Sequence, residues 1–248
     1  MYVDVLKLRD WYFTPVGHTV RRVVQAYLNE MWPTLKGERV LVVGYGIPYI
    51  NLWLKESQVF CAMPAGQGVV HWPQDGDNRT TLVWDSHLPF ADLFFDKILL
   101  IHELEFANEA PLLDECERVL KPDGRLLSVV PNRTGAWCRR EEVSPFGRGR
   151  PFSGMQMNKL MRKNGFLTTQ SCYGLFIPPT RKEWILKYYD TAEKIGQRWR
   201  APLGGVLLTE AKKDHFGGKA VRVEDGEAAV RRPCFNAAGA TMQNKGNN

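Results

Sequence analysis

The 248-residue sequence has no apolar run long enough to cross a membrane and no apolar leader at its start. Its longest apolar runs, such as Lys97 to Ile101, are far shorter than the ~20 residues that a spanning helix needs. The opening residues MYVDVLKLRDWYF contain acids where a signal peptide has a continuous apolar core. These absences predict a cytoplasmic protein that does not associate with membranes.

The sequence also lacks any CxxC pair. Its five cysteines are scattered and odd in number, which favours neither a disulfide framework nor a zinc site. We therefore expect no metal and reduced thiols packed in the interior. The cysteines concerned are Cys61, Cys116, Cys138, Cys172 and Cys234.

Acidic residues are scarce in one segment of a chain whose formal net charge is +6. Between Asn132 and Lys163, eight basic residues oppose only Glu141 and Glu142. The segment is interpreted as a solvated basic loop, as a lid that recognises an anionic substrate, or as a surface for RNA. The arginines that would form such a lid are Arg139, Arg140, Arg148 and Arg150.

A glycine turn follows the first predicted strand, in VLVVGYGIPY from Val40 to Tyr49. Four apolar residues predict a strand buried on both faces, and Gly44 and Gly46 let the backbone turn sharply and approach a ligand. The acid and the third glycine that are usual in such turns are missing, because Val42 and Pro48 stand in their places. Pro48 fits the first turn of a helix, lacks an amide hydrogen and predicts an extended Ile47.

Hydrophobic periodicity predicts strands that alternate with helices, the pattern of a doubly wound α/β sheet. We divide the chain into an N-terminal helical segment (1–36), a core domain (37–213) and a flexible C-terminal tail (214–248). Seven strands are expected at 40–43, 58–63, 80–84, 96–102, 125–130, 167–173 and 206–211. Helices are expected at 16–31, 49–55, 112–120, 157–161 and 184–199.

Four segments occur in an order that resembles a known family: ERVLVVGYGIPYI, HLPFADLFFDKILLIHELEF, LLDECERVLKPDGRLLSVVPN and FSGMQMNKLMRKNGF. They resemble the class I S-adenosylmethionine-dependent methyltransferases, type 11-like methyltransferase domain, over Glu38 to Phe166. GYGIPY and AMPAGQGVVHWP resemble an uncharacterised bacterial branch. The resemblance implies a Rossmann-like seven-stranded sheet, mostly parallel with an antiparallel last strand.

The resemblance also implies where S-adenosylmethionine would bind. The glycine turn would take its amino-acid end, and the end of the second strand would take its ribose. That strand ends at Met63 without a carboxylate, and the amide of Gln67 is a candidate substitute. An acid after the third strand would receive the adenine amino group. The residues that the resemblance places around the cofactor are Gly44, Tyr45, Gly46, Met63, Asp85, Ser86 and His87.

Four residues at the ends of the fourth and fifth strands complete the predicted cleft, since open α/β sheets bind ligands beyond the carboxyl ends of their strands. His102 is the candidate catalytic residue because imidazole relays protons near neutral pH. Glu103, Asn132 and Arg133 would border the substrate. Glu105 is interpreted as facing the next helix start.

Three functions remain open on the sequence alone. The first is S-adenosylmethionine-dependent transfer of a methyl group to a small or mildly anionic molecule. The second is a pseudoenzyme that keeps the fold for binding or regulation, which the missing acids and third glycine favour. The third is an RNA methyltransferase that uses the basic segment, although the chain lacks an Asn or Asp followed by Pro-Pro-aromatic.

Overall fold

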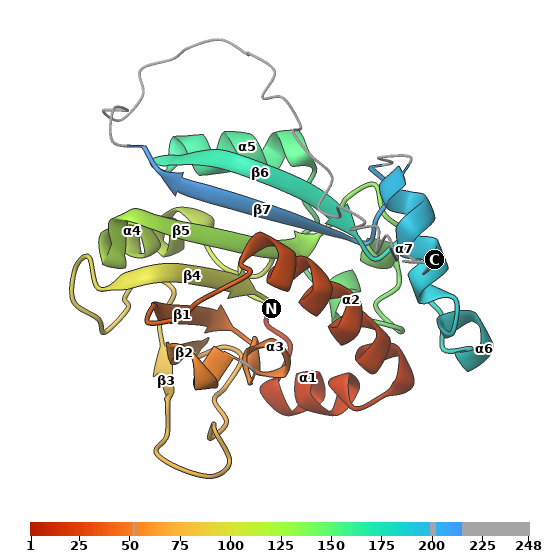
Figure 1. Cartoon of the computed structure of the whole chain (residues 1–248), viewed down its shortest axis with the longest axis horizontal. Helices are drawn as coiled ribbons and strands as arrows, with labels where there is room; N and C mark the ends of the chain where they lie inside the picture. The colour runs from red at the N-terminus through yellow and green to blue at the C-terminus, as the bar shows by residue number, and fades with distance from the viewer. Residues whose placement is uncertain (52, 199–201, 215–248) are drawn as a thin grey trace, which may run out of the picture.

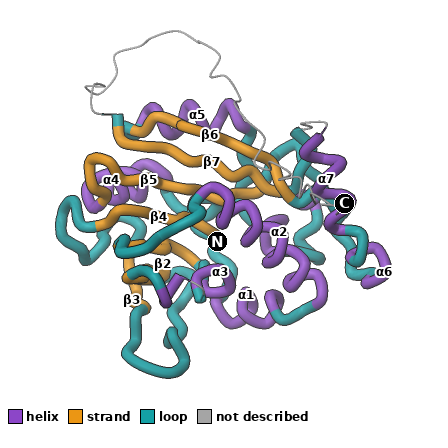
Figure 2. The backbone as a smooth tube through the Cα atoms, in the orientation of Figure 1, coloured by secondary structure: helices purple, strands orange, loops and turns teal. Residues whose placement is uncertain are grey.

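The computed structural model describes residues 1–51, 53–198 and 202–214, and its elements are shown in Figures 1 and 2. The strands are β1 (Arg39–Gly44), β2 (Gln58–Pro64), β3 (Thr80–Val83), β4 (Phe95–Ile101), β5 (Leu120–Pro131), β6 (Phe166–Gly174) and β7 (Val206–Lys213). The α-helices are α1 (Val5–Tyr12), α2 (Pro15–Met31), α3 (Ile47–Ile50), α4 (Glu109–Val119), α5 (Gly154–Lys163), α6 (Glu183–Leu186) and α7 (Tyr189–Arg198). Three short 3₁₀ helices are η1 (Trp53–Lys55), η2 (Trp137–Arg139) and η3 (Pro145–Gly147).

The seven strands form one sheet in the order β3-β2-β1-β4-β5-β7-β6. The first five pair in parallel, whereas β7 lies between β5 and β6 and is antiparallel to both. The predicted Rossmann-like sheet with an antiparallel last strand is therefore confirmed. In the parallel half of the sheet, the carboxyl ends of β1 to β4 lie at one edge. The order of the strands reverses between β1 and β4, which is where such sheets bind ligands.

Both faces of the sheet are covered, which explains the continuous apolar run of β1. Val40 and Val42 pack on the side that α1 and α2 cover, and Leu41 and Val43 pack on the side of α4 and α5. Figure 1 shows these two layers in front of and behind the strands.

The two N-terminal helices are capped by their own sequence. Asp4 precedes α1 and accepts hydrogen bonds from the amides of Leu6 and Lys7, and Thr14 caps α2, whose first residue is a proline.

Helix α1 was not predicted as a separate element. The division at residue 36 stays a prediction, and the expected tail lies outside the described residues from residue 215 onward.

Two helices differ from the sequence prediction. The helix expected at 49–55 is divided into the four-residue α3 and the 3₁₀ helix η1, and Ile47 is the first residue of α3 and not extended as predicted. The helix expected at 184–199 is divided into α6 and α7. Each part has its own anchor: Leu186 of α6 is buried, and Glu193 of α7 accepts the amides of Leu175 and Phe176.

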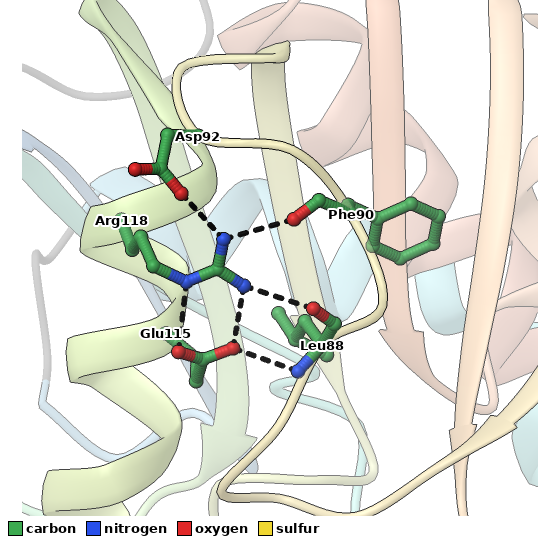
Figure 3. A network of polar contacts seen from close by, with 5 residues as sticks. All are labelled: Leu88, Phe90, Asp92, Glu115 and Arg118. Carbon is green, nitrogen blue, oxygen red and sulfur yellow. Dashed lines mark hydrogen bonds and ion pairs between the residues drawn. The ribbon is translucent and has the colours of Figure 1, made fainter.

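The Leu88-Pro89-Phe90 segment is fixed to α4 by Arg118 (Figure 3). The Arg118 guanidinium makes a bidentate contact with Glu115 at 2.9 and 2.7 Å, and it donates to the carbonyls of Leu88 and Phe90 and to Asp92. Glu115 in turn accepts the Leu88 amide at 2.7 Å. Two of the segments that carry the family resemblance are thus joined through one side chain.

The cysteine prediction holds at three positions. Cys61 and Cys116 are buried free thiols and Cys172 is also buried, but Cys138 is only half-buried because its loop lies at the surface, and Cys234 lies outside the described residues. Within residues 1–51, 53–198 and 202–214, no helix is both long and apolar enough to cross a bilayer.

Candidate functional site

The two glycines of the turn after β1 are required by the packing of the protein itself. Gly44 has φ +89°, and a Cβ placed on it would lie 2.2 Å from the carbonyl oxygen of Ile101. A Cβ on Gly46 would lie 2.3 Å from Cγ1 of Val42. Val42 is fully buried beneath the turn, where an acid would be an uncompensated charge. The turn is therefore adapted to an apolar strand end.

Three tyrosines cover this turn. Tyr45 is 3% exposed and its ring lies 5.9 Å from that of Tyr12, whose hydroxyl lies 2.7 Å from the hydroxyl of Tyr49. Burial raises the pKa of Tyr45 to about 12 and raises the pKa of Tyr49 further, so these phenols stay neutral. The side chains supply hydrogen bonds and apolar surface to the site without adding charge.

His102 is held from several sides at the end of β4. It is fully buried, and its φ of +54° is a left-handed conformation that costs a non-glycine residue about 1–3 kcal/mol. Its Nε2 lies 2.7 Å from the Tyr12 hydroxyl, and its Nδ1 lies 3.5 Å from Glu105. The Phe146 ring packs against it at 4.5 Å between centroids. Strained, buried residues with polar partners are typical of functional sites.

Glu105 was predicted to face the next helix start. Instead its carboxylate lies beside His102, with both oxygens buried and without a hydrogen-bond partner within the described part of the chain. Its position is fixed by the backbone, because its carbonyl accepts the amide of Arg150 at 2.9 Å. The arrangement joins a carboxylate, an imidazole and two phenols in one buried chain.

Two buried oxygens at the same edge of the sheet point to a ligand. Gln67, after β2, is 2% exposed and donates to the carbonyl of His102 at 3.1 Å. Its Oε1 and the Oε2 of Glu103, after β4, are buried and have no hydrogen-bond partner among the described residues. Buried acceptors without partners are costly, so donors from a bound molecule would stabilise them. Met63, the next-to-last residue of β2, is fully buried.

Tyr2 connects the ends of β3 and β4. Its hydroxyl lies 2.7 Å from Oδ2 of Asp85 and 3.0 Å from Oε1 of Glu103. The Tyr2 hydroxyl has one proton and can donate it to only one of the two carboxyl groups. The other carboxyl group has to carry a proton of its own and donate it to the Tyr2 oxygen. Burial, and then the charge of Asp85, raises the pKa of Glu103 well above its usual value. Glu103 is therefore the protonated partner.

The structure places the other predicted site residues outside this cluster. Ser86 and His87 are exposed, in a turn where His87 pairs with Trp84. The Asn132 amide donates to the carbonyls of Pro202 and Gly204, and Arg133 is exposed and donates to the carbonyl of Pro151. Ser86 and His87 follow Asp85 at the surface. Asn132 holds the backbone at Pro202 and Gly204.

The basic segment is partly neutralised by ion pairs. Arg150 pairs with Glu109 at the start of α4, and Arg140 pairs with Glu142. The segment also packs over Glu105, because a Cβ placed on Gly149 would lie 2.3 Å from Cγ of Glu105. These residues close one side of the buried cluster. Across the described residues, no group of three or more His, Cys, Asp and Glu side chains is arranged to hold a metal ion.

A cavity of about 830 Å³ opens beside the tyrosines. Its wall contains Tyr12 and Tyr45, and two arginines, Arg9 and Arg21, line it from α1 and α2. Phe13 and, from the connection between β2 and β3, Trp72 contribute further aromatic side chains. Asp10 also lines the cavity and pairs with Arg9 at 2.9 Å, so a negatively charged group of a small molecule with an apolar body would meet Arg21 beside this ion pair.

Sequence reasoning missed Tyr2 and Tyr12, the two side chains that the N-terminal segment brings to the site. A pattern was available for the second: Asp4 as a cap with Val5, Leu8 and Tyr12 at helical spacing predicts a short amphipathic helix with an aromatic on its buried face. No local pattern marks Tyr2.

Comparisons with known proteins agree with this fold. A family model described as "Methyltransferase domain" matches residues 68–128. A SAM-dependent methyltransferase from Thermotoga maritima is 20% identical with a TM-score of 0.54, and covers 84% of this chain and 96% of its own. Geranyl diphosphate C-methyltransferase from Streptomyces coelicolor is 14% identical with a TM-score of 0.52, and 77% of each chain is covered. The fold is that of a Rossmann-like methyltransferase.

The chain thus has the fold of the class I S-adenosylmethionine-dependent methyltransferases, and its residues 68–128 are similar to their methyltransferase domain. An uncharacterised protein from Methanocaldococcus jannaschii, MJ0638, is 47% identical over 135 residues. The matched region is 52% of this chain and 58% of that relative. The more specific bacterial branch stays a prediction.

Proposed function

We propose that the protein transfers a methyl group from S-adenosylmethionine to a small anionic acceptor in the cytoplasm. The observation that carries the proposal is the pair of buried acceptors without partners, Gln67 Oε1 and Glu103 Oε2, at the edge of the sheet where this fold binds ligands. Asp85 lies beside them. A ribose and an adenine amino group offer the donors that these oxygens lack.

The residues present fit the nucleoside end of the cofactor better than its amino-acid end. Gln67 would receive a ribose hydroxyl in place of the missing acid, and Asp85 with Glu103 would receive the adenine. At the amino-acid end, α3 has only four residues, so its dipole adds little to the Gly44–Gly46 turn. When bound, the cofactor supplies an activated methyl group, and the protein chiefly has to align acceptor and methyl.

The acceptor would occupy the cavity beside Tyr12 and Tyr45. Arg21 would hold its anionic group, beside the ion pair of Arg9 with Asp10, and the aromatic walls would hold its body. Tyr12 both lines this cavity and contacts His102, so a proton released by the acceptor can pass to the Tyr12 oxygen as Tyr12 gives its own proton to Nε2. Glu105 would stabilise the resulting imidazolium.

A methyltransferase-like binding protein is the second candidate. It is favoured by the apolar Val42 beneath the turn, by the strand end at Met63 without an acid, and by Tyr2 in contact with Asp85 and Glu103. Such a protein would use the cavity for a ligand without transferring a methyl group. The basic segment, with Arg140 and Arg150 in ion pairs, supports RNA as a partner less well.

Calorimetric titration with S-adenosylmethionine and S-adenosylhomocysteine tests the proposal. We expect binding that is measurable at ~0.1 mM protein, with an affinity reduced ~10 to 100-fold by the missing acid. Asp85→Asn should weaken it, whereas Asp114→Asn, an exposed acid on α4, should not. If neither compound gives a heat of binding, the transferase proposal is wrong and the methyltransferase-like binding protein is the remaining candidate. Gly44 variants are unsuitable, because any side chain there meets the Ile101 carbonyl.

A further inference from the structure

The segment before α1 fills the space that the proposed nucleoside site would need. The Tyr2 ring lies against Gly66, where an added Cβ would be 2.6 Å from a ring carbon, and packs on Phe106 at 5.6 Å between centroids. Its hydroxyl reaches Asp85 and Glu103. An aromatic ring with one polar edge thus lies between the ends of β2, β3 and β4.

We propose that Tyr2 is a displaceable plug, which competes with the purine ring of the cofactor for the space between Gly66, Asp85 and Glu103. The inference rests on the proposed function, because it takes this space to be the nucleoside site. Tyr2 would then set the affinity for the cofactor without being part of the reaction.

The local structure allows the plug to leave without unfolding the helix behind it. Helix α1 begins at Val5, and Asp4 caps it by accepting the amides of Leu6 and Lys7. Leu8 and Tyr12 are buried and hold α1 on the core, and the Val5 amide donates to the carbonyl of Gln67 at 2.9 Å. Only residues 1–3 have to move, and of these only Val3 is buried.

The polar groups of the pocket also favour exchange of Tyr2 for a ligand with more donors. Tyr2 brings one hydroxyl proton to a pocket with several acceptor oxygens. Even with Tyr2 in place, Glu103 Oε2 and Gln67 Oε1 have no partner among the described residues. A nucleoside, with an amino group and two ribose hydroxyls, can satisfy acceptors that Tyr2 leaves unsatisfied.

The test measures the binding of adenosine and S-adenosylhomocysteine to the full chain and to Tyr2 variants by calorimetry. Tyr2→Ala removes the ring and both contacts, so both compounds should bind ~10 to 100-fold more tightly than to wild type. Tyr2→Phe keeps the ring and should give a smaller gain. Tyr188→Ala, at a tyrosine that is 64% exposed on another surface, is the control and should change nothing.

A second readout follows the segment itself. If the plug leaves, saturating S-adenosylhomocysteine should raise the chymotrypsin cleavage rate at Tyr2 in wild type, while the thermal midpoint of the protein does not fall. Equal or weaker binding by Tyr2→Ala, with wild type binding well, would overturn the plug and leave the proposed function intact. Absence of binding in every variant, all folded, would overturn both. Binding by Tyr2→Ala alone would support both.

Discussion

Tyr12 in α1 and His102 at the end of β4, 90 positions apart in the chain, lie 2.7 Å apart through the tyrosine hydroxyl and Nε2. The same hydroxyl contacts Tyr49, so one oxygen joins the N-terminal helix, the helix after the glycine turn and the strand that carries the candidate catalytic residue. The position of α1 therefore determines the geometry of the site.

The Tyr12 hydroxyl should contribute to stability through both partners. Tyr12→Phe leaves Nε2 of His102 and the Tyr49 hydroxyl buried with one partner fewer, and should lower the free energy of unfolding by about 1–3 kcal/mol. Adding Tyr49→Phe should cost less than the sum of the two single variants, because both polar groups of that pair are then gone. Urea unfolding measures this, with Tyr188→Phe as control. Strict additivity would contradict the contact.

Glu103 should make the protein less stable as pH rises. Its pKa is raised well above the usual value by burial and by Asp85, so the native state binds more protons than the unfolded state between those two values. The free energy of unfolding then falls with pH in that window, by at most about 1.4 kcal/mol per pH unit. Glu103→Gln has no proton to lose and should flatten this dependence.

Chemical unfolding of both proteins from pH 4.5 upward, in steps of about half a unit, measures the difference in slope. Glu193, whose pKa burial also raises, contributes the same sign to both proteins and cancels in the comparison. Identical slopes would mean that Glu103 is ionised in the native state and that the Tyr2 contacts are arranged differently.

Replacing Arg118 should lower the free energy of unfolding more than replacing a typical residue near the surface. Arg118→Ala leaves Glu115 and the carbonyls of Leu88 and Phe90 without its donors, and should lower the free energy of unfolding by about 2–4 kcal/mol. Arg118→Lys keeps the charge but not the planar fork, so it should restore only part. Arg9→Ala removes an exposed pair with Asp10 and should change stability by less than ~0.5 kcal/mol. Equal effects of the two alanine variants would refute the network.

The side chain of Val42 should be the reason that the turn requires a glycine at position 46. Gly46→Ala places a methyl group on Cγ1 of Val42 and should cost about 1–3 kcal/mol by overpacking. Val42→Ala removes that atom, so the double variant should be more stable than the sum of the single effects predicts, by about 0.5–3 kcal/mol. Thermal unfolding of the four proteins measures this coupling. No coupling would mean that the turn requires its glycine for another reason.

The strand pattern made most of the sheet predictable. Val40 to Val43 alternate between two covered faces, and the ends of parallel strands meet at one edge, so Gln67, Asp85, His102 and Glu103 could be grouped from the sequence. The contacts of Tyr2, 83 and 101 positions from its partners, depend on where α1 docks, and no local pattern encodes that. The place of Asn132 at the cleft stays a prediction, and the two backbone carbonyls to which its amide nitrogen donates could not be read from the sequence.

The position of β7 between β5 and β6 sets an order for folding during synthesis. Residues Phe166–Gly174 of β6 pair with β7 in the sheet and are synthesised before Val206–Lys213. Strands β1 to β5 can assemble as the chain emerges, whereas β6 has to wait as an unpaired strand until the polypeptide doubles back. The last strand therefore completes the sheet in its interior rather than extending its edge.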